Sequence, residues 1–119
     1  MSEFESNPLL TFACVQMVSS TRVDDNLAAA VRGIVQAAKT GAQVVVLPEY
    51  FCIMGQKDSD KVAVAEAYRG DTPDEHTPIQ RAVQTFAKQH QIYLIAGTIP
   101  LKSPDADKVY NTTLVYAPD

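Results

Sequence analysis

One run of residues limits what this chain can fold into more than any other feature. Residues 43–47 read QVVVL, and every position after the glutamine is apolar. A strand with one solvated face alternates apolar and polar residues, whereas a strand covered on both faces is apolar throughout. The run therefore predicts a strand inside a sheet that is covered on both faces.

The residues before this run predict a parallel βαβ unit. Residues 10–18, LTFACVQMV, form a short apolar segment followed by a Ser-Ser-Thr cluster, which is typical of a buried strand. An amphipathic helix is expected between Asp24 and Lys39, because acidic residues precede its apolar face and Gly41 follows it. Strand, helix and strand in this order place the two strands in parallel. The apolar helix positions recur at spacings of three and four: Leu27, Ala30, Val31, Ile34, Val35 and Ala38.

The second half of the chain predicts another helix and a hairpin. The long connection 50–76 has room for one short helix and ends in a turn-rich stretch. Thr77 and Gln80 have the spacing of a capping box, with a proline at the first helical position. Two apolar runs, 92–101 and 109–117, are joined by a polar loop and should pair as antiparallel strands. The order of a βαβ unit, a long connection, a helix and a hairpin predicts an α/β layered fold with a largely buried sheet.

Composition excludes several classes of function. The 119 residues are the size of one domain, and 46% apolar against 20% charged residues is typical of a globular protein. Ten basic and fourteen acidic residues give a formal net charge of -4 without a basic run, so no nucleic-acid partner is expected. No apolar stretch approaches the roughly 18 residues of a membrane span. The acidic start is unlike a signal peptide, so we expect a cytoplasmic protein without a membrane partner.

Glu49 is the residue most suggestive of function. It follows the apolar run directly, after Pro48, whose missing N–H ends the pairing of the strand. In open α/β sheets, ligands bind at the carboxyl ends of parallel strands. We therefore expect Glu49 to be largely buried and to face a cleft, a setting that suits a general base. The alternative is a structural carboxylate that forms an ion pair or caps a helix.

Several motifs together resemble the nitrilase superfamily of carbon–nitrogen hydrolases. They are CVQM, DNLAAAV, GAQVVVLPEYF, GTIPL and YNTTLVYAPD, in the order and spacing of the N-terminal part of that family. Residues 49–68 look most like the branch related to deaminated glutathione amidase. The resemblance implies a nitrilase-like αββα sandwich. Residues 1–119 would then be the N-terminal part of a single domain that continues past residue 119, with residues 1–9 as a flexible start.

The resemblance also implies a mechanism with a glutamate, a lysine and a cysteine, without metal or organic cofactor. Glu49 occupies the position of the glutamate, which takes the proton of the cysteine thiol and later activates water. The lysine and the cysteine are expected beyond residue 119, so the chain alone should be inactive. The whole protein should be a homodimer or higher homo-oligomer that cleaves a small-molecule amide, with deaminated glutathione as one candidate. A nitrilase, an N-carbamoyl hydrolase and a catalytically silent binding module remain alternatives.

Other polar and aromatic residues are candidates for the site or for its support. Tyr50 and Phe51 are expected to line the pocket or to pack beneath it. Asn111, inside a predicted strand, is expected to hold the active-site loops by hydrogen bonds. Cys14 is expected in the core, and Cys52 lacks the electropositive surroundings of a reactive thiol. Three further residues are assigned structural or surface roles: Lys108 in a loop, His76 beside Glu75, and His90 at a helix end.

Overall fold

The computed structural model describes residues 9–119. The flexible start expected for residues 1–9 lies outside the described residues, apart from Leu9. The helices are α2 (Val23–Lys39), α3 (Asp58–Val64) and α4 (Pro78–His90). The strands are β1 (Phe12–Cys14), β2 (Val44–Val46), β3 (Tyr93–Ile95), β4 (Ile99–Lys102), β5 (Val109–Thr112) and β6 (Val115–Tyr116).

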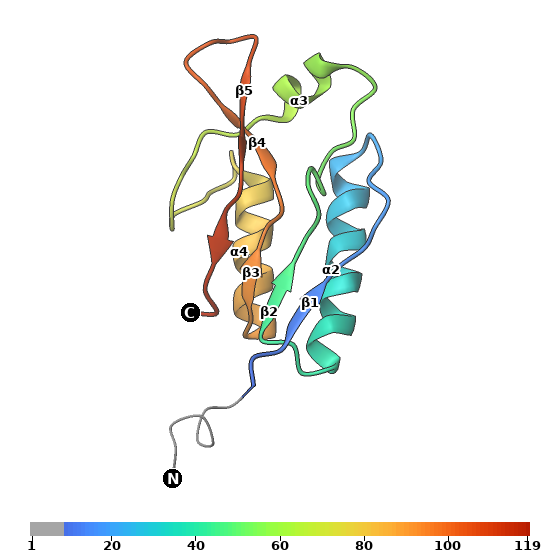
Figure 1. Cartoon of the computed structure of the whole chain (residues 1–119). Coiled ribbons are helices and arrows are strands. Elements are labelled where there is room, and N and C mark those ends of the chain that lie inside the picture. The colour runs from blue at the N-terminus through green and yellow to red at the C-terminus, as the bar shows by residue number, and fades with distance from the viewer. Residues whose placement is uncertain (1–8) are drawn as a thin grey trace.

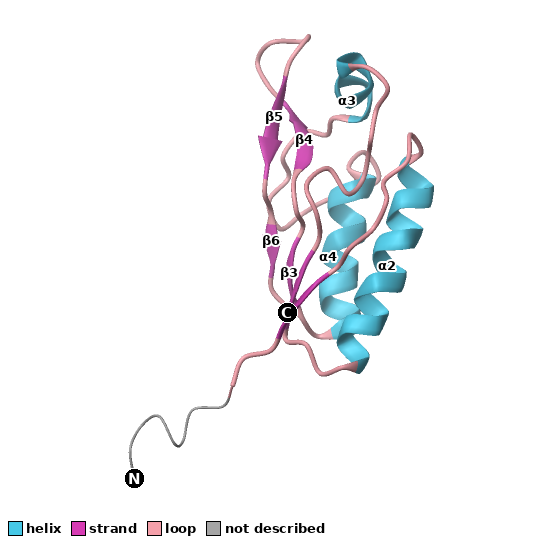
Figure 2. Ribbon diagram, turned by 45° about the vertical axis from the view of Figure 1, so that its right-hand side comes forward, coloured by secondary structure: helices cyan, strands magenta, loops and turns pink. Residues whose placement is uncertain are grey.

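The main sheet has the strand order β1-β2-β3-β6 (Figure 1). Strands β1, β2 and β3 are parallel, and β6 runs antiparallel to β3. The predicted βαβ unit is therefore confirmed, with α2 as the crossover between β1 and β2. Figure 2 shows α2 and α4 side by side on one face of this sheet. None of the helices in residues 9–119 is long and apolar enough to span a membrane.

Alternate residues of the strands divide the sheet into a covered face and an open face. Val45 and Leu94 lie in register and are fully buried, together with Ile34 of α2 and Val83 of α4. These residues form the core between the sheet and the two helices. The opposite face has no covering layer within residues 9–119, and its outer members are exposed: Phe12 (58%), Tyr93 (51%) and Val115 (62%). The chain thus forms an α/β pair of layers, which is half of the expected αββα arrangement.

The two predicted hairpin strands pair as expected, but each is broken into two. Residues 92–101 divide into β3 and β4, and residues 109–117 divide into β5 and β6, with β3 paired to β6 and β4 to β5. Gly97 causes the first break, because its φ of +41° turns the chain between the two strands. A side chain at this position would overlap the carbonyl oxygen of Pro48. The single long hairpin of the sequence interpretation is therefore wrong at its centre.

Helix α4 begins at the predicted proline but is not capped as predicted. Thr77 is the N-cap residue, yet its side chain makes no capping bond to the helix. The side-chain amide of Gln80 does not reach back either, because it donates to Glu66 Oε1 and to the carbonyl of Ala67. Glu66 caps the helix instead, since its carboxylate accepts the N–H groups of Ile79 at 2.6 Å and Gln80 at 3.1 Å. The cap comes from the long connection, outside the range of a local motif.

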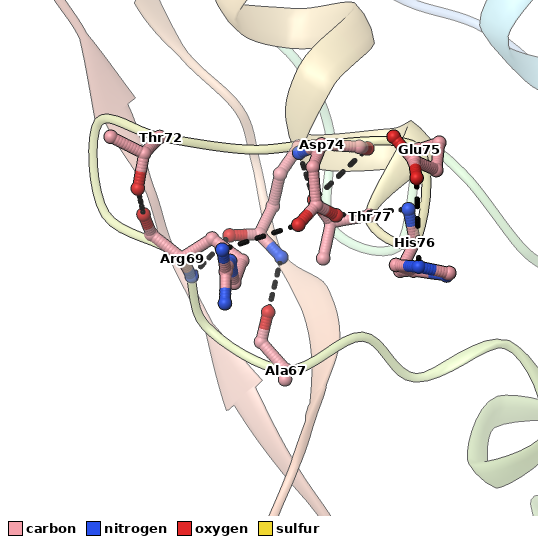
Figure 3. A network of polar contacts seen from close by, with 8 residues as sticks. Ala67, Arg69, Thr72, Asp74, Glu75, His76 and Thr77 are labelled. Atoms are coloured by element: carbon pink, nitrogen blue, oxygen red, sulfur yellow. Dashed lines mark hydrogen bonds and ion pairs between the residues drawn. The ribbon is translucent and has the colours of Figure 1, made fainter.

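The long connection is ordered and carries the predicted short helix, α3. A turn stabilised by polar contacts precedes α4 (Figure 3). Within it, the guanidinium of Arg69 pairs with Asp74 at 3.2 Å, and the N–H of His76 donates to the same carboxylate at 2.9 Å. The hydrogen bond from the His76 N–H holds the pKa of Asp74 below its usual value; desolvation opposes this shift, and the Arg69 charge adds to it. The connection therefore fixes the start of α4 from two sides.

Candidate active site

Glu49 lies where the sequence interpretation placed it, at the carboxyl end of parallel strand β2. The last regular main-chain bond of the strand runs from Leu47 N to Ile95 O, at 2.9 Å. The regular bonds to β3 end there, and Pro48, which lacks an N–H, occupies a position that faces β1, as Val46 does when its carbonyl accepts the Val15 N–H at 2.9 Å. Glu49 nevertheless stays beside the neighbouring segment, because it forms an isolated parallel bridge with Thr98. The two segments that leave β2 and β3 thus run together past the ends of their strands.

The residue after Glu49 has an unusual backbone conformation. Tyr50 has a φ of +48°, in the left-handed region that aromatic residues rarely adopt. Such a conformation costs on the order of 1–3 kcal/mol and persists only where the surroundings fix it. Here the N–H of Tyr50 donates to Thr98 Oγ1 at 2.9 Å, and the N–H of Phe51 donates to the carbonyl of Pro48 at 3.2 Å. The chain therefore turns sharply just after the glutamate.

Buried residues hold the loop that follows this turn. Phe51 and Cys52 are fully buried, so Phe51 packs beneath the site, one of the two roles expected for it. The hydroxyl of Ser19 donates to Phe51 O at 2.9 Å, and the side-chain amide of Asn26 donates to Cys52 O at 2.8 Å. Asn26 was missed as a supporting residue. Its signal was the spacing of four residues before Ala30, which places it on the buried face of α2.

The side chain of Glu49 is exposed, so the prediction that it is largely buried is wrong for this chain. Four cavities of about 290 to 570 Å³ over the described residues have other linings. Glu49 is exposed because the open face of the sheet has no second layer within residues 9–119 to enclose the strand ends. The structural alternative also receives no support, since the carboxylate forms no ion pair or hydrogen bond with a side chain in that range. The acid is fixed through its backbone alone.

The aromatic residue that follows the acid carries a cation on its ring. The ammonium group of Lys61, on α3, is 4.1 Å from the centre of the Tyr50 ring, within the range of a cation–π interaction. Partial burial, and then the negative charge of Glu49, raise the pKa of the Tyr50 hydroxyl. The charge of Glu49 thus acts on the hydroxyl group of Tyr50. Tyr50 thus lies beside Glu49 along the chain and contacts Lys61 through its ring.

Comparison with known proteins identifies the family. The sequence profile of the carbon-nitrogen hydrolase family matches residues 11–119. The chain belongs to the carbon–nitrogen hydrolase family. The omega-amidase NIT2 of Mus musculus is 36% identical over 107 residues, which are 90% of this chain and 35% of that protein. The deaminated glutathione amidase of Synechocystis is 32% identical over 108 residues, 90% of this chain and 37% of that protein.

Solved structures give the same assignment. Nit3 of Saccharomyces cerevisiae, a member of branch 10 of the nitrilase superfamily, superposes with a TM-score of 0.77 and 29% identity. The match covers 92% of this chain and 40% of Nit3. The NitFhit protein of C. elegans superposes with a TM-score of 0.73 and 28% identity over 93% of this chain and 26% of its own length. This carbon–nitrogen hydrolase chain spans about a third of the length of the curated relatives it matches.

The two cysteines of this carbon–nitrogen hydrolase chain differ in burial. Burial raises the pKa of the Cys52 thiol to about 12; a backbone hydrogen bond lowers it by less, and the charge of Glu66 adds to the rise. Cys52 is therefore a neutral thiol at physiological pH. Cys14 is exposed, because its position in β1 puts its side chain on the open face. The expectation that Cys14 is a core residue is therefore wrong for the described residues.

The remaining candidates are exposed or lie at the end of a helix. Asn111 is exposed in β5, where it pairs with Pro100, and within residues 9–119 its side chain forms none of the expected hydrogen bonds to loops. Lys108 is exposed in the loop before β5, and His90 is the last residue of α4, both as predicted. His76 lies 3.7 Å from Glu75 in an exposed pair. Residues 9–119 contain no group of three His, Cys, Asp or Glu side chains placed to bind a metal.

Proposed function

We propose that the protein containing this chain is a small-molecule amidase in which Glu49 is the general base. One observation carries the proposal: a carboxylate without a side-chain partner in residues 9–119 lies at the carboxyl end of a parallel strand, and the backbone holds it there through the bridge to Thr98. Ligands bind at such strand ends in open α/β sheets. Membership in the carbon–nitrogen hydrolase family and the amidases among its relatives support this reading.

The proposed reaction has two stages. Glu49 accepts the proton of a cysteine thiol, and the thiolate attacks the amide carbonyl to form a tetrahedral intermediate. The nitrogen leaves with a proton returned by Glu49, which gives a thioester. Glu49 then takes a proton from water, whose attack releases the acid and regenerates the thiol. A lysine beside the oxyanion would stabilise the charge that develops in both stages.

The proposed lysine and cysteine are residues that the family resemblance places after residue 119. Cys52 does not suit the nucleophile's role, because a thiol with a pKa of about 12 supplies almost no thiolate near neutral pH. The first substrates to test are deaminated glutathione and omega-amides of small acids, the classes named in the relatives. A nitrile and an N-carbamoyl compound belong in the same assay as the alternative substrates. We also propose that the whole protein is a cytoplasmic homodimer or higher homo-oligomer that needs no metal or organic cofactor.

Replacement of Glu49 in the full-length protein tests the proposal. Glu49→Gln should lower kcat for the amide by about 100- to 10,000-fold, because a neutral amide cannot accept the thiol proton. Glu75→Gln is the matched control, since the Glu75 side chain is 79% exposed in the turn before α4. Thermal unfolding of both variants establishes that the fold is intact. Near-parental turnover by folded Glu49→Gln would contradict the proposed role.

A further inference from the structure

The direction of the Glu49 side chain depends on its backbone. Within residues 9–119 no side chain holds the carboxylate, so rotation of the neighbouring peptide groups would move it freely. Catalysis by a general base needs a fixed geometry, because proton transfer requires hydrogen-bond distance to the reacting group. Residues that fix the peptide groups on either side of Glu49 are therefore candidates for a role in the reaction.

The peptide group before Glu49 is fixed by close contact. Gly97 lies so near to the chain that an added side chain would overlap Pro48 O and would approach Leu47 O to 2.6 Å. The N–H of Gly97 donates to Ile95 O at 2.8 Å, which closes a tight turn at this point. This turn brings Thr98 beside Glu49, where the two residues form their isolated bridge.

The peptide group after Glu49 is fixed by one side-chain hydrogen bond. The N–H of Tyr50 donates to Thr98 Oγ1 at 2.9 Å. Tyr50 has a φ of +48°, a conformation that relaxes unless its surroundings hold it. The N–H of Phe51 donates to Pro48 O at 3.2 Å and closes the same loop. This bond joins two other peptide groups and does not involve the one between Glu49 and Tyr50. Thr98 is the side chain that acts on this peptide directly.

We propose that Thr98 is a positioning residue for the catalytic base. Its hydroxyl accepts the Tyr50 N–H, maintains the left-handed turn and so directs the Glu49 carboxylate toward the reacting groups. The regular main-chain bonds between β2 and β3 end at Leu47, and the threonine hydroxyl ties the two segments together beyond that point. The branched side chain suits this task, because its rotamers are restricted. This inference rests on the proposed role of Glu49 as the base.

Two substitutions in the full-length enzyme separate the hydrogen bond from the bulk of the side chain. Thr98→Val keeps the branched shape and removes the acceptor, whereas Thr98→Ser keeps the acceptor. Thr98→Val should lower kcat about 10- to 100-fold with KM changed less than about threefold, because a displaced base slows the reaction without weakening substrate binding. Thr98→Ser should keep kcat within about threefold of the parent. Rates are expressed per folded enzyme, with the folded fraction taken from thermal unfolding.

Thr85→Val is the matched control for a threonine-to-valine change. The Thr85 hydroxyl donates to Arg81 O at 2.9 Å on the exposed side of α4, so its removal should leave kcat unchanged. If Thr98 only fastened the loop, both Thr98 variants would alter stability while kcat per folded enzyme stayed at the parental value. Such a result, or equal losses of kcat in Thr98→Val and Thr98→Ser, overturns the inference.

Two further results keep the test decisive. If Thr98→Val does not fold, Thr98→Ala removes the same acceptor without adding bulk, and equal kcat values for Thr98→Ala and Thr98→Ser overturn the inference. Glu49→Gln is assayed in parallel. Loss of activity in Glu49→Gln with full activity in folded Thr98→Val overturns the positioning role alone. Full activity in folded Glu49→Gln overturns both the positioning role and the proposed function.

Discussion

The carboxylate of Glu66 caps helix α4 by accepting the N–H of Ile79 at 2.6 Å. Glu66 is buried, and its main chain also pairs with β4 through the bond from Lys102 N to Glu66 O, at 2.9 Å. A negative charge at a helix N-terminus interacts favourably with the helix dipole and satisfies N–H groups that would otherwise lack a partner. This one residue therefore joins the connection, the helix and the smaller sheet.

Replacement of Glu66 should destabilise the protein without direct involvement of the active site. Glu66→Gln retains one acceptor oxygen but turns an amide group toward the helix N–H groups, so we expect a loss of about 2 kcal/mol in the free energy of unfolding. Urea unfolding of the full-length protein measures this loss. Glu75→Gln, at an exposed position, should change the value by less than about 0.5 kcal/mol. Equal stability of the two variants would show that the cap contributes little.

Two glycines with positive φ provide a paired test of the contact behind Glu49. Gly97→Ala should cost about 3 kcal/mol or more, because the added methyl group overlaps the Pro48 carbonyl oxygen. Gly41 has a φ of +87° and no atom within 4 Å of an added Cβ, so Gly41→Ala should cost only about 1–2 kcal/mol from backbone strain. Thermal unfolding of the two full-length variants gives the comparison. A smaller loss for Gly97→Ala than for Gly41→Ala would contradict the close approach.

The pattern of the sequence predicted the layers but not the details that shape the site. The run 43–47 and the helix periodicity depend on local spacing, and both predicted elements are present. Gly97 inside the run 92–101 is a local signal for a break, but the segment that approaches it, at Pro48, lies about fifty residues earlier and has no local signal. The capping role of Glu66 is long-range for the same reason. Burial of Glu49 was predicted from its strand position, whereas it depends on whether another layer covers the open face.

The pKa of Cys52 predicts how the reactivity of this thiol and the folding stability of the protein depend on pH. Burial raises this pKa from about 9 in the unfolded chain to about 12 in the folded one. The unfolded state thus loses a proton first, so the contribution of Cys52 to stability is full below pH 9 and falls as the pH rises toward 12. Alkylation of native protein at pH 8, followed by peptide mass spectrometry, should leave Cys52 unmodified, whereas unfolded protein should react there. Rapid native modification of Cys52 would contradict its burial.

The open face of the sheet predicts how residues 1–119 behave when purified alone. Phe12, Tyr93 and Val115 are all more than half exposed on this face, and large apolar patches seldom stay exposed on a soluble monomer. We expect the isolated chain to associate, and sedimentation velocity at several concentrations should show it. The double change Phe12→Lys and Val115→Lys places charges at both edges of the face and should reduce association. Met54→Lys, at a residue that is 53% exposed on the connection, should leave it unchanged.

The same isolated chain should not hydrolyse amides. Glu49 alone has no thiolate to generate, because Cys52 is a buried neutral thiol and no lysine has been assigned to the oxyanion within this chain. Deaminated glutathione and simple omega-amides are the substrates to assay, with release of the amine or ammonia as the readout. Turnover that Glu49→Gln abolished would mean that residues 1–119 contain a complete catalytic site.

The association test has a separate contradicting outcome. A monodisperse monomer that unfolds cooperatively would mean that the open face needs no cover, and this result is independent of the hydrolysis assay.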